Sequence, residues 1–150
     1  MRHRSRTENP EGAPYQWERY VSASGVRVVE NELDECLQTG CRSQFDYDLC
    51  HSEIEVRLQR AAAGQLGVAG VEPAQPVRSQ PELWEIRWAF DSRQLRLYHA
   101  EPASHPQVLL ELKYHWKVWQ GLAASDIEAR QNQQMSEAAQ RYRLSRVYET

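Results

Sequence analysis

Apolar and polar side chains alternate strictly in three consecutive stretches between residues 83 and 117. Large apolar side chains stand at every second position, at Trp84, Ile86, Trp88 and Phe90 in residues 83–90 and at Leu95 and Leu97 in residues 94–99. A period of two is typical of a β-strand with one buried face and one polar face. The turn Asp91-Ser92-Arg93 has the right length to join the first two stretches as a hairpin. The pattern therefore predicts a three-stranded antiparallel sheet that is covered by helices on one face.

The third stretch, residues 110–117, continues the alternation and completes the polar face. Its apolar set is Leu110, Leu112, Tyr114 and Trp116, and its polar set is Glu111, Lys113, His115 and Lys117. On the first two strands, Arg87, Arg96 and Tyr98 share the polar side with Glu85. The sequence thus predicts an open face that is rich in cations.

The rest of the chain predicts helices around this sheet. Apolar residues at three- and four-residue steps predict helices over residues 26–38 and 46–63, and a weaker pattern predicts a third over 123–140. Residues 15–21 suit a short strand. The fold class is therefore α+β, with the order β-α-α-β-β-β-α. Residues 1–14 are expected to form a flexible leader, and residues 15–150 a single domain.

Charge and composition exclude several classes of protein. The chain has 150 residues and a net charge of −3, so a uniformly basic nucleic-acid coat is excluded and any RNA contact must be a local patch. Its two lysines are Lys113 and Lys117. No apolar run approaches the ~20 residues that cross a bilayer, and no signal sequence is evident, so a cytoplasmic protein is expected.

The three cysteines, Cys36, Cys41 and Cys50, are an odd set without a CxxC pair. We expect reduced thiols, although a zinc site that also used His51 is conceivable. The remaining histidines fit no metal triad, and no phosphate loop or dinucleotide fingerprint is present. No metal and no cofactor is expected.

The predicted polar face carries the groups that RNA cleavage without a metal requires. Arginine and lysine bind phosphate and stabilise the charge that develops on its oxygens, and His115 can transfer a proton near neutral pH. Tyr98 can stack on a base or relay a proton, and Trp119 is the tryptophan that is best placed for base stacking. The other interpretation is a solvated sheet face on which Glu85 and Glu111 pair with their cationic neighbours.

Five segments in this order resemble the RelE/HigB superfamily of type II toxins, and most closely its phage-derived HigB-like branch. They are Tyr20-Val-Ser-Ala-Ser-Gly-Val-Arg-Val-Val-Glu-Asn-Glu-Leu, Leu83-Trp-Glu-Ile-Arg, Arg96-Leu-Tyr, Leu109-Leu with the following lysine-bearing strand, and Asp126-Ile-Glu-Ala-Arg. The resemblance covers residues 15–143. It departs from the family at Glu85, a position that is often basic in the ribonucleases, and at Lys-Tyr-His-Trp-Lys, which replaces a Lys-Lys cluster.

The resemblance implies a RelE-like fold and a toxin that cleaves ribosome-associated mRNA without a metal. It also implies a ribosome as partner and silencing by a cognate antitoxin, which we expect to be of the helix-turn-helix type. Arg96, His115, Lys113 and Lys117 are the predicted catalytic residues. The predicted RNA-binding residues are Arg87, Tyr98, Trp119, Arg141 and Tyr142.

Two alternatives stay open at this point. One is a non-enzymatic relative of the ParE type, which shares the fold and inhibits DNA gyrase by binding. The other is an inactive protein-binding module of the same fold.

Overall fold

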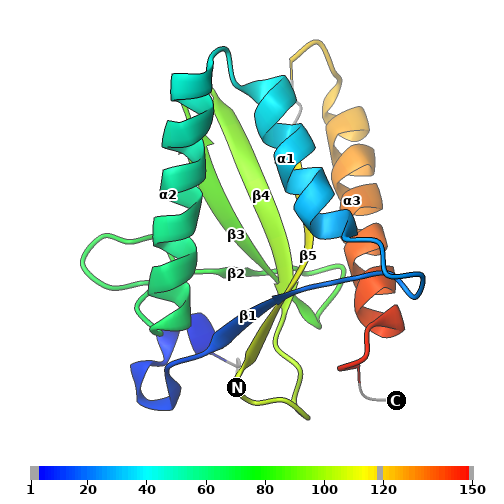
Figure 1. The fold of residues 1–150 in the computed structure, drawn as a ribbon. Helices are drawn as coiled ribbons and strands as arrows, with labels where there is room; N and C mark the ends of the chain where they lie inside the picture. Colours follow the sequence, from blue (N-terminus) through cyan, green and yellow to red (C-terminus); the bar gives the residue numbers. More distant parts are fainter. Residues whose placement is uncertain (1–3, 118–119, 149–150) are drawn as a thin grey trace.

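We describe residues 4–117 and 120–148 of a computed structural model (Figure 1). The three helices are α1 (Val28–Gly40), α2 (Gln44–Ala62) and α3 (Ala124–Leu144). The strands are β1 (Gln16–Arg19), β2 (Gln75–Pro76), β3 (Leu83–Phe90), β4 (Arg93–Ala100) and β5 (Val108–Lys117). The predicted α+β class is confirmed, and the predicted order of elements gains the two-residue strand β2. In the described residues, no helix is both long and apolar enough to form a membrane span.

The five strands form one mixed sheet in the order β1-β5-β4-β3-β2. The three predicted strands pair antiparallel as a meander, whereas β1 runs parallel to the first half of β5. The pairing of β1 ends at Arg19 opposite Glu111, so the second half of β5 extends beyond it. This second half carries three of the predicted catalytic residues, Lys113, His115 and Lys117, and the fourth, Arg96, lies on the neighbouring strand β4.

Helices α1 and α2 pack on the apolar face of the sheet (Figure 1). Val29, Leu33 and Leu37 form one buried stripe on α1, and Ile54 and Leu58 continue the core on α2. Burial of apolar side chains from both layers is the main favourable contribution to folding.

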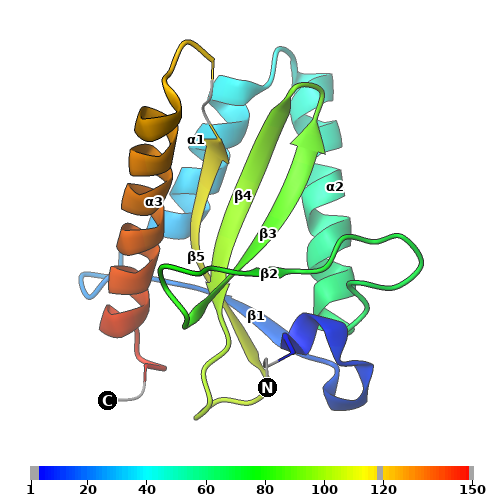
Figure 2. The same cartoon turned by 180° about the vertical axis from the view of Figure 1, so that it is seen from behind.

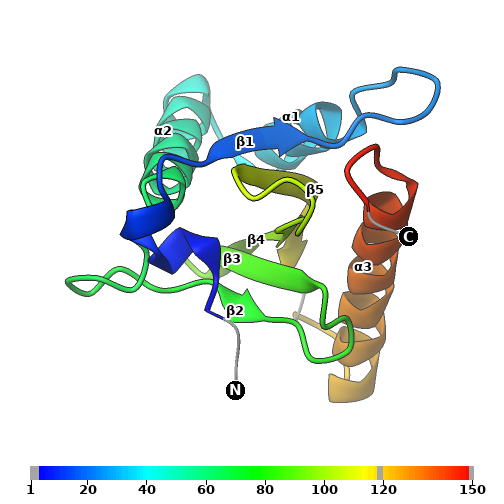
Figure 3. The same cartoon turned by 90° about the horizontal axis from the view of Figure 1, so that it is seen from below.

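Helix α3 lies on the other side of the sheet, beside β5 (Figures 2 and 3). The sequence analysis predicts that all helices pack on one face of the sheet. Helix α3 packs on the opposite face instead, because the side chains that it contacts there are polar. Its Glu137 carboxylate lies 2.8 Å from the ammonium of Lys113, on the predicted polar face. Only Ala138, Ala139 and Tyr142 of this helix are buried.

A β-bulge at Leu112 changes the predicted faces of β5. Tyr98 pairs with Lys113, but the next residue, His99, pairs with Glu111, which leaves Leu112 without a partner. The extra residue reverses the side on which the preceding residues point. Glu111 therefore lies on the helix-covered face, where its carboxylate accepts hydrogen bonds from Arg19 and from the Tyr114 hydroxyl. The prediction that Glu111 shares a face with Lys113 is wrong.

The described part of the predicted leader is docked on the domain. Arg6 donates hydrogen bonds to the carbonyls of Pro102, His105 and Val108. The Ser5 hydroxyl is buried and donates to Glu101 at 2.5 Å. Residues 4–14 therefore pack as part of the domain and do not extend from it as the predicted leader.

Candidate functional site

The predicted polar side chains do share one face of the sheet, which we call the basic face. In the strand register, Arg87 lies opposite Arg96, which lies opposite His115. The flanking pair, Tyr98 and Lys113, and the pair Gln94 and Lys117 point to the same side. The basic face thus consists of Arg87, Arg96, Tyr98, Lys113, His115 and Lys117.

This face is largely covered, contrary to the expectation of an open surface. Arg96 is 3% exposed, Lys113 6% and His115 8%, and Tyr98 is fully buried. Arg87 and Lys117 are the more accessible members, with intermediate burial. Helix α3 and neighbouring side chains cover the rest. Because the buried cations need compensation, their partners determine what the face can do.

Glu85 is the carboxylate at the centre of the arginine pair. It is buried, and it accepts a hydrogen bond from Arg87 and lies 3.3 Å from Nε of Arg96. Arg96 also donates two hydrogen bonds to the side-chain oxygen of Gln94, at 3.1 and 2.9 Å. One carboxylate is therefore shared by two guanidinium groups.

The pKa of Lys117 is lowered by burial and, in part, because positive charges are concentrated on the basic face. Burial lowers this pKa from its ordinary value, and the charges of Arg96 and Arg87 lower it further, against the opposing effect of Glu85. An anion such as phosphate would relieve the repulsion among these cations.

Tyr98 and His115 form a hydrogen-bonded pair at the centre of the basic face. His115 Nε2 lies 3.0 Å from the Tyr98 hydroxyl, and the two rings stack with centroids 5.3 Å apart. His115 Nδ1 lies 3.2 Å from the Trp116 carbonyl oxygen. Since a carbonyl only accepts, Nδ1 carries the proton, and Nε2 accepts from the tyrosine hydroxyl. Burial raises the pKa of Tyr98 to about 12, which keeps this hydroxyl protonated.

Burial lowers the pKa of His115 to about 4, and the positive charges of Arg96 and Lys113 act in the same direction. The unfolded chain, with a histidine pKa near 6.5, therefore binds a proton more readily than the folded protein between these values. We expect the stability that comes from burying neutral His115 to be fully present above pH 6.5 and to be lost as the pH falls toward 4. Urea unfolding gives the free energy of unfolding of the wild type and of His115→Phe. We expect the difference between these two free energies to change by about 3 kcal/mol across this pH range. A pH-independent difference would contradict the assignment.

Lys113 belongs to a network that joins three elements. Its ammonium lies 2.9 Å from Glu32 of α1 and 2.8 Å from Glu137 of α3. Glu32 also accepts from the backbone N–H of Tyr114 at 2.9 Å and from the guanidinium of Arg141. Arg141 in turn donates to the carbonyl of Leu112. These contacts attach α1 and α3 to β5, so the geometry gives Lys113 a structural role.

A polar cavity of about 330 Å³ lies between the end of β5 and the first half of α3. His115 and Lys117 line it from the strand, and Arg130 and Gln134 from the helix. Gln134 Oε1 is buried and has no hydrogen-bond partner in the described residues. The cavity therefore combines two cations and amide groups with the histidine of the Tyr98–His115 pair.

Comparison with protein families, curated proteins and solved structures finds no match to this chain. The chemistry of the site therefore has to be argued from its own residues.

Two of the remaining predicted RNA-binding residues, Arg141 and Tyr142, make their contacts away from the Tyr98–His115 pair. Arg141 is engaged with Glu32, as described above, and Tyr142 is buried with its ring edge-to-face against Tyr148 at 4.9 Å. Trp119 lies outside the described residues. The structure thus brings together Arg87, Arg96, Tyr98, His115 and Lys117, and it does not bring Arg141 or Tyr142 into this group.

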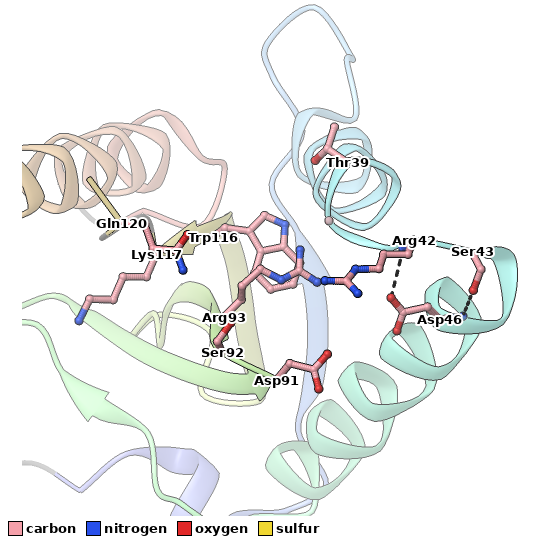
Figure 4. A pocket seen from close by; sticks show the side chains of 11 residues that line it. Thr39, Arg42, Ser43, Asp46, Asp91, Ser92, Arg93, Trp116, Lys117 and Gln120 are labelled. Atoms are coloured by element: carbon pink, nitrogen blue, oxygen red, sulfur yellow. Dashed lines mark hydrogen bonds between the residues drawn. The ribbon is translucent and has the colours of Figure 1, made fainter. Parts of the chain in front are cut away.

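Sequence reasoning missed a second and larger cavity, which we call the tip cavity. It measures about 720 Å³ and lies between the α1–α2 turn, the β3–β4 hairpin and the end of β5 (Figure 4). Arg42, Arg93 and Trp116 line it. Trp116 was expected in the core, but it is only partly buried. Arg42 lies in the turn between α1 and α2 and Arg93 is the first residue of β4 after the hairpin turn, and such positions carry no periodic signal.

The cysteines agree with the expectation of free thiols. Cys36, Cys41 and Cys50 form no disulfide. Among the residues that the structure describes, no three His, Cys, Asp or Glu side chains lie close enough together to hold a metal ion.

Proposed function

We propose that this chain is a toxin of a type II toxin–antitoxin system that cleaves ribosome-associated mRNA without a metal. The observation that carries the proposal is the gathering of Arg87, Arg96 and Lys117 around the Tyr98–His115 pair, next to the polar cavity. The group combines cations for a phosphate with a histidine that is neutral at physiological pH. The resemblance of the sequence to the RelE/HigB superfamily supports the same activity.

The chemistry assigns one task to each residue. The 2′-oxygen of the RNA forms a bond to phosphorus, and the bond between phosphorus and the 5′-oxygen breaks, which leaves a 2′,3′-cyclic phosphate. The proton of the 2′-hydroxyl goes to the oxygen of Tyr98 as the Tyr98 hydroxyl proton moves to Nε2 of His115, which is unprotonated because the pKa of this group is about 4. Arg96 stabilises the charge on the phosphate oxygens, and Arg87 positions the phosphate. Lys117, with its lowered pKa, donates a proton to the departing 5′-oxygen.

Expression of the chain in bacterial cells, followed by mapping of RNA 5′ ends, tests the proposal. We expect growth arrest and new 5′-hydroxyl ends within translated messages. Co-expression of a helix-turn-helix antitoxin encoded beside the toxin gene should suppress both effects. Intact messages in growth-arrested cells would contradict cleavage.

One observation favours a function without cleavage. Arg96 and Lys113 are buried and already face the carboxylates of Glu85, Glu32 and Glu137, so the basic face could serve binding alone. In that case the same cells would show intact messages together with inhibited DNA gyrase, as expected of a ParE-like toxin. With neither effect, a protein-binding module would be favoured.

A further inference from the structure

The tip cavity presents two guanidinium groups. Arg42 follows α1 and Arg93 begins β4, and both side chains extend toward Trp116 (Figure 4). Within residues 4–117 and 120–148, the structure gives neither guanidinium an ion pair. Two such groups directed into one polar cavity are suited to bind an anion with several oxygen atoms.

The cavity is built on a fixed aromatic ring. The Nε1–H of Trp116 donates to the Cys36 carbonyl at 2.8 Å. A Cβ atom at Gly40 would lie 2.6 Å from the same ring, so the indole packs directly on the backbone of α1. The guanidinium carbon of Arg93 lies 4.5 Å from the ring centroid. Trp116 therefore holds Arg93 against the wall of the cavity by a cation–π interaction.

Two acidic residues also line the cavity, and their positions leave room for an anion. Asp46 accepts a hydrogen bond from the backbone N–H of Arg42 at 3.2 Å, and its own N–H donates to the Ser43 hydroxyl. This is a capping arrangement, in which the start of α2 offsets the carboxylate charge. Asp91 lies in the hairpin turn with φ of +55°. It is exposed, and its repulsion of an anion is screened by solvent.

We propose that the tip cavity binds a phosphodiester group of the RNA strand, between Arg42 and Arg93. This inference rests on the proposed function, because it extends the path of the RNA beyond the basic face. Trp116 lies between His115 and Lys117 in sequence, and Lys117 lines both this cavity and the polar cavity beside His115. In Figure 4 the Lys117 side chain points away from the two arginines, as expected at the boundary between the two cavities. A strand held at His115 therefore passes around the end of β5 and places a neighbouring phosphate at the tip.

Binding of a 2′-O-methyl RNA oligonucleotide tests the inference without depending on cleavage. Its blocked 2′-oxygens cannot attack phosphorus, so binding and chemistry are separated. We expect Arg42→Ala and Arg93→Ala each to weaken binding about tenfold. The slope of log affinity against log salt concentration should fall by about 0.7 for each variant, since one phosphate contact on a single strand is lost. Asp91→Asn, which removes one negative charge at the rim, should tighten binding.

The matched control is Arg27→Ala, because Arg27 is an exposed arginine before the first residue of α1, at the end of that helix farthest from the cavity. If all three alanine variants bind alike, the tip cavity has no phosphate site and the inference fails. If adenosine monophosphate binds more tightly than the oligonucleotide and competes with it, the ligand is a free nucleotide, and the strand assignment fails.

Mapping of RNA ends with the same variants separates this inference from the proposed function. Binding that depends on Arg42 and Arg93, without any cleavage by the wild type, would support the tip site and contradict the ribonuclease. If the wild type cleaves RNA, and both variants cleave at the full rate and bind with unchanged affinity, the ribonuclease is supported and the tip site is contradicted.

Discussion

Arg96→Ala is expected to lower the rate of RNA cleavage by about 10²- to 10³-fold, which is the usual cost of losing one preorganised donor to a developing oxyanion. Arg96 lies opposite His115 in the sheet and is held by Gln94 and Glu85. Its guanidinium is therefore fixed before the substrate arrives, and no reorganisation is required in the transition state. The rate of cleavage of ribosome-bound message under single-turnover conditions measures the effect.

Two further variants distinguish a catalytic loss from a structural one. Arg96→Lys keeps the charge but loses the forked geometry, and we expect it to recover only part of the rate. Arg143→Ala removes the same charge from an exposed position on α3, where the guanidinium pairs with Glu82. We expect this variant to cleave RNA at the wild-type rate. Cleavage by Arg96→Ala at the wild-type rate, in a variant that unfolds at the same urea concentration, would exclude Arg96 from the chemistry.

Glu32→Ala is expected to destabilise the protein by about 3 kcal/mol, because it removes one partner of a mostly buried ionic network. The substitution leaves Lys113 with Glu137 alone and Arg141 without its carboxylate. It also removes the acceptor of the Tyr114 backbone N–H. Urea unfolding at neutral pH measures the loss.

Glu30→Ala is the matched control on the same helix. Glu30 is exposed and pairs at 3.5 Å with Arg27, which is also exposed. Such surface pairs contribute little, so we expect a change within about 0.5 kcal/mol. Equal effects of the two substitutions would show that the Glu32 network does not hold α1 and α3 to the sheet.

The shared face of Arg87, Arg96 and His115 was predictable because strand alternation is a local property. Each side chain follows from the parity of its position within one strand. The prediction failed at Glu111, because the bulge at Leu112 depends on how β4 pairs with β5 and leaves no mark in the alternation itself. The strand β2 was missed for a related reason, since two residues are too few to show a period.

The covering of the basic face was not predictable, because it depends on partners that are distant in sequence. Lys113 and Glu32 are 81 residues apart, and Glu32 and Arg141 are 109 residues apart. The weak apolar pattern of α3 gives no indication of which side of the sheet it covers. Arg42 and Arg93 were likewise passed over, since they meet only when the α1–α2 turn and the β3–β4 hairpin approach each other.

The contacts along the second half of β5 also bear on how the protein avoids aggregation. Beyond the end of β1, the peptide groups of Leu112 and Tyr114 are bonded to side chains of Arg141, Glu32 and Cys36. At the opposite margin of the sheet, β2 contains Pro76, which has no N–H to offer. A strand from another molecule therefore meets fewer free donors and acceptors along the second half of β5 and at β2, so pairing with these two segments is disfavoured.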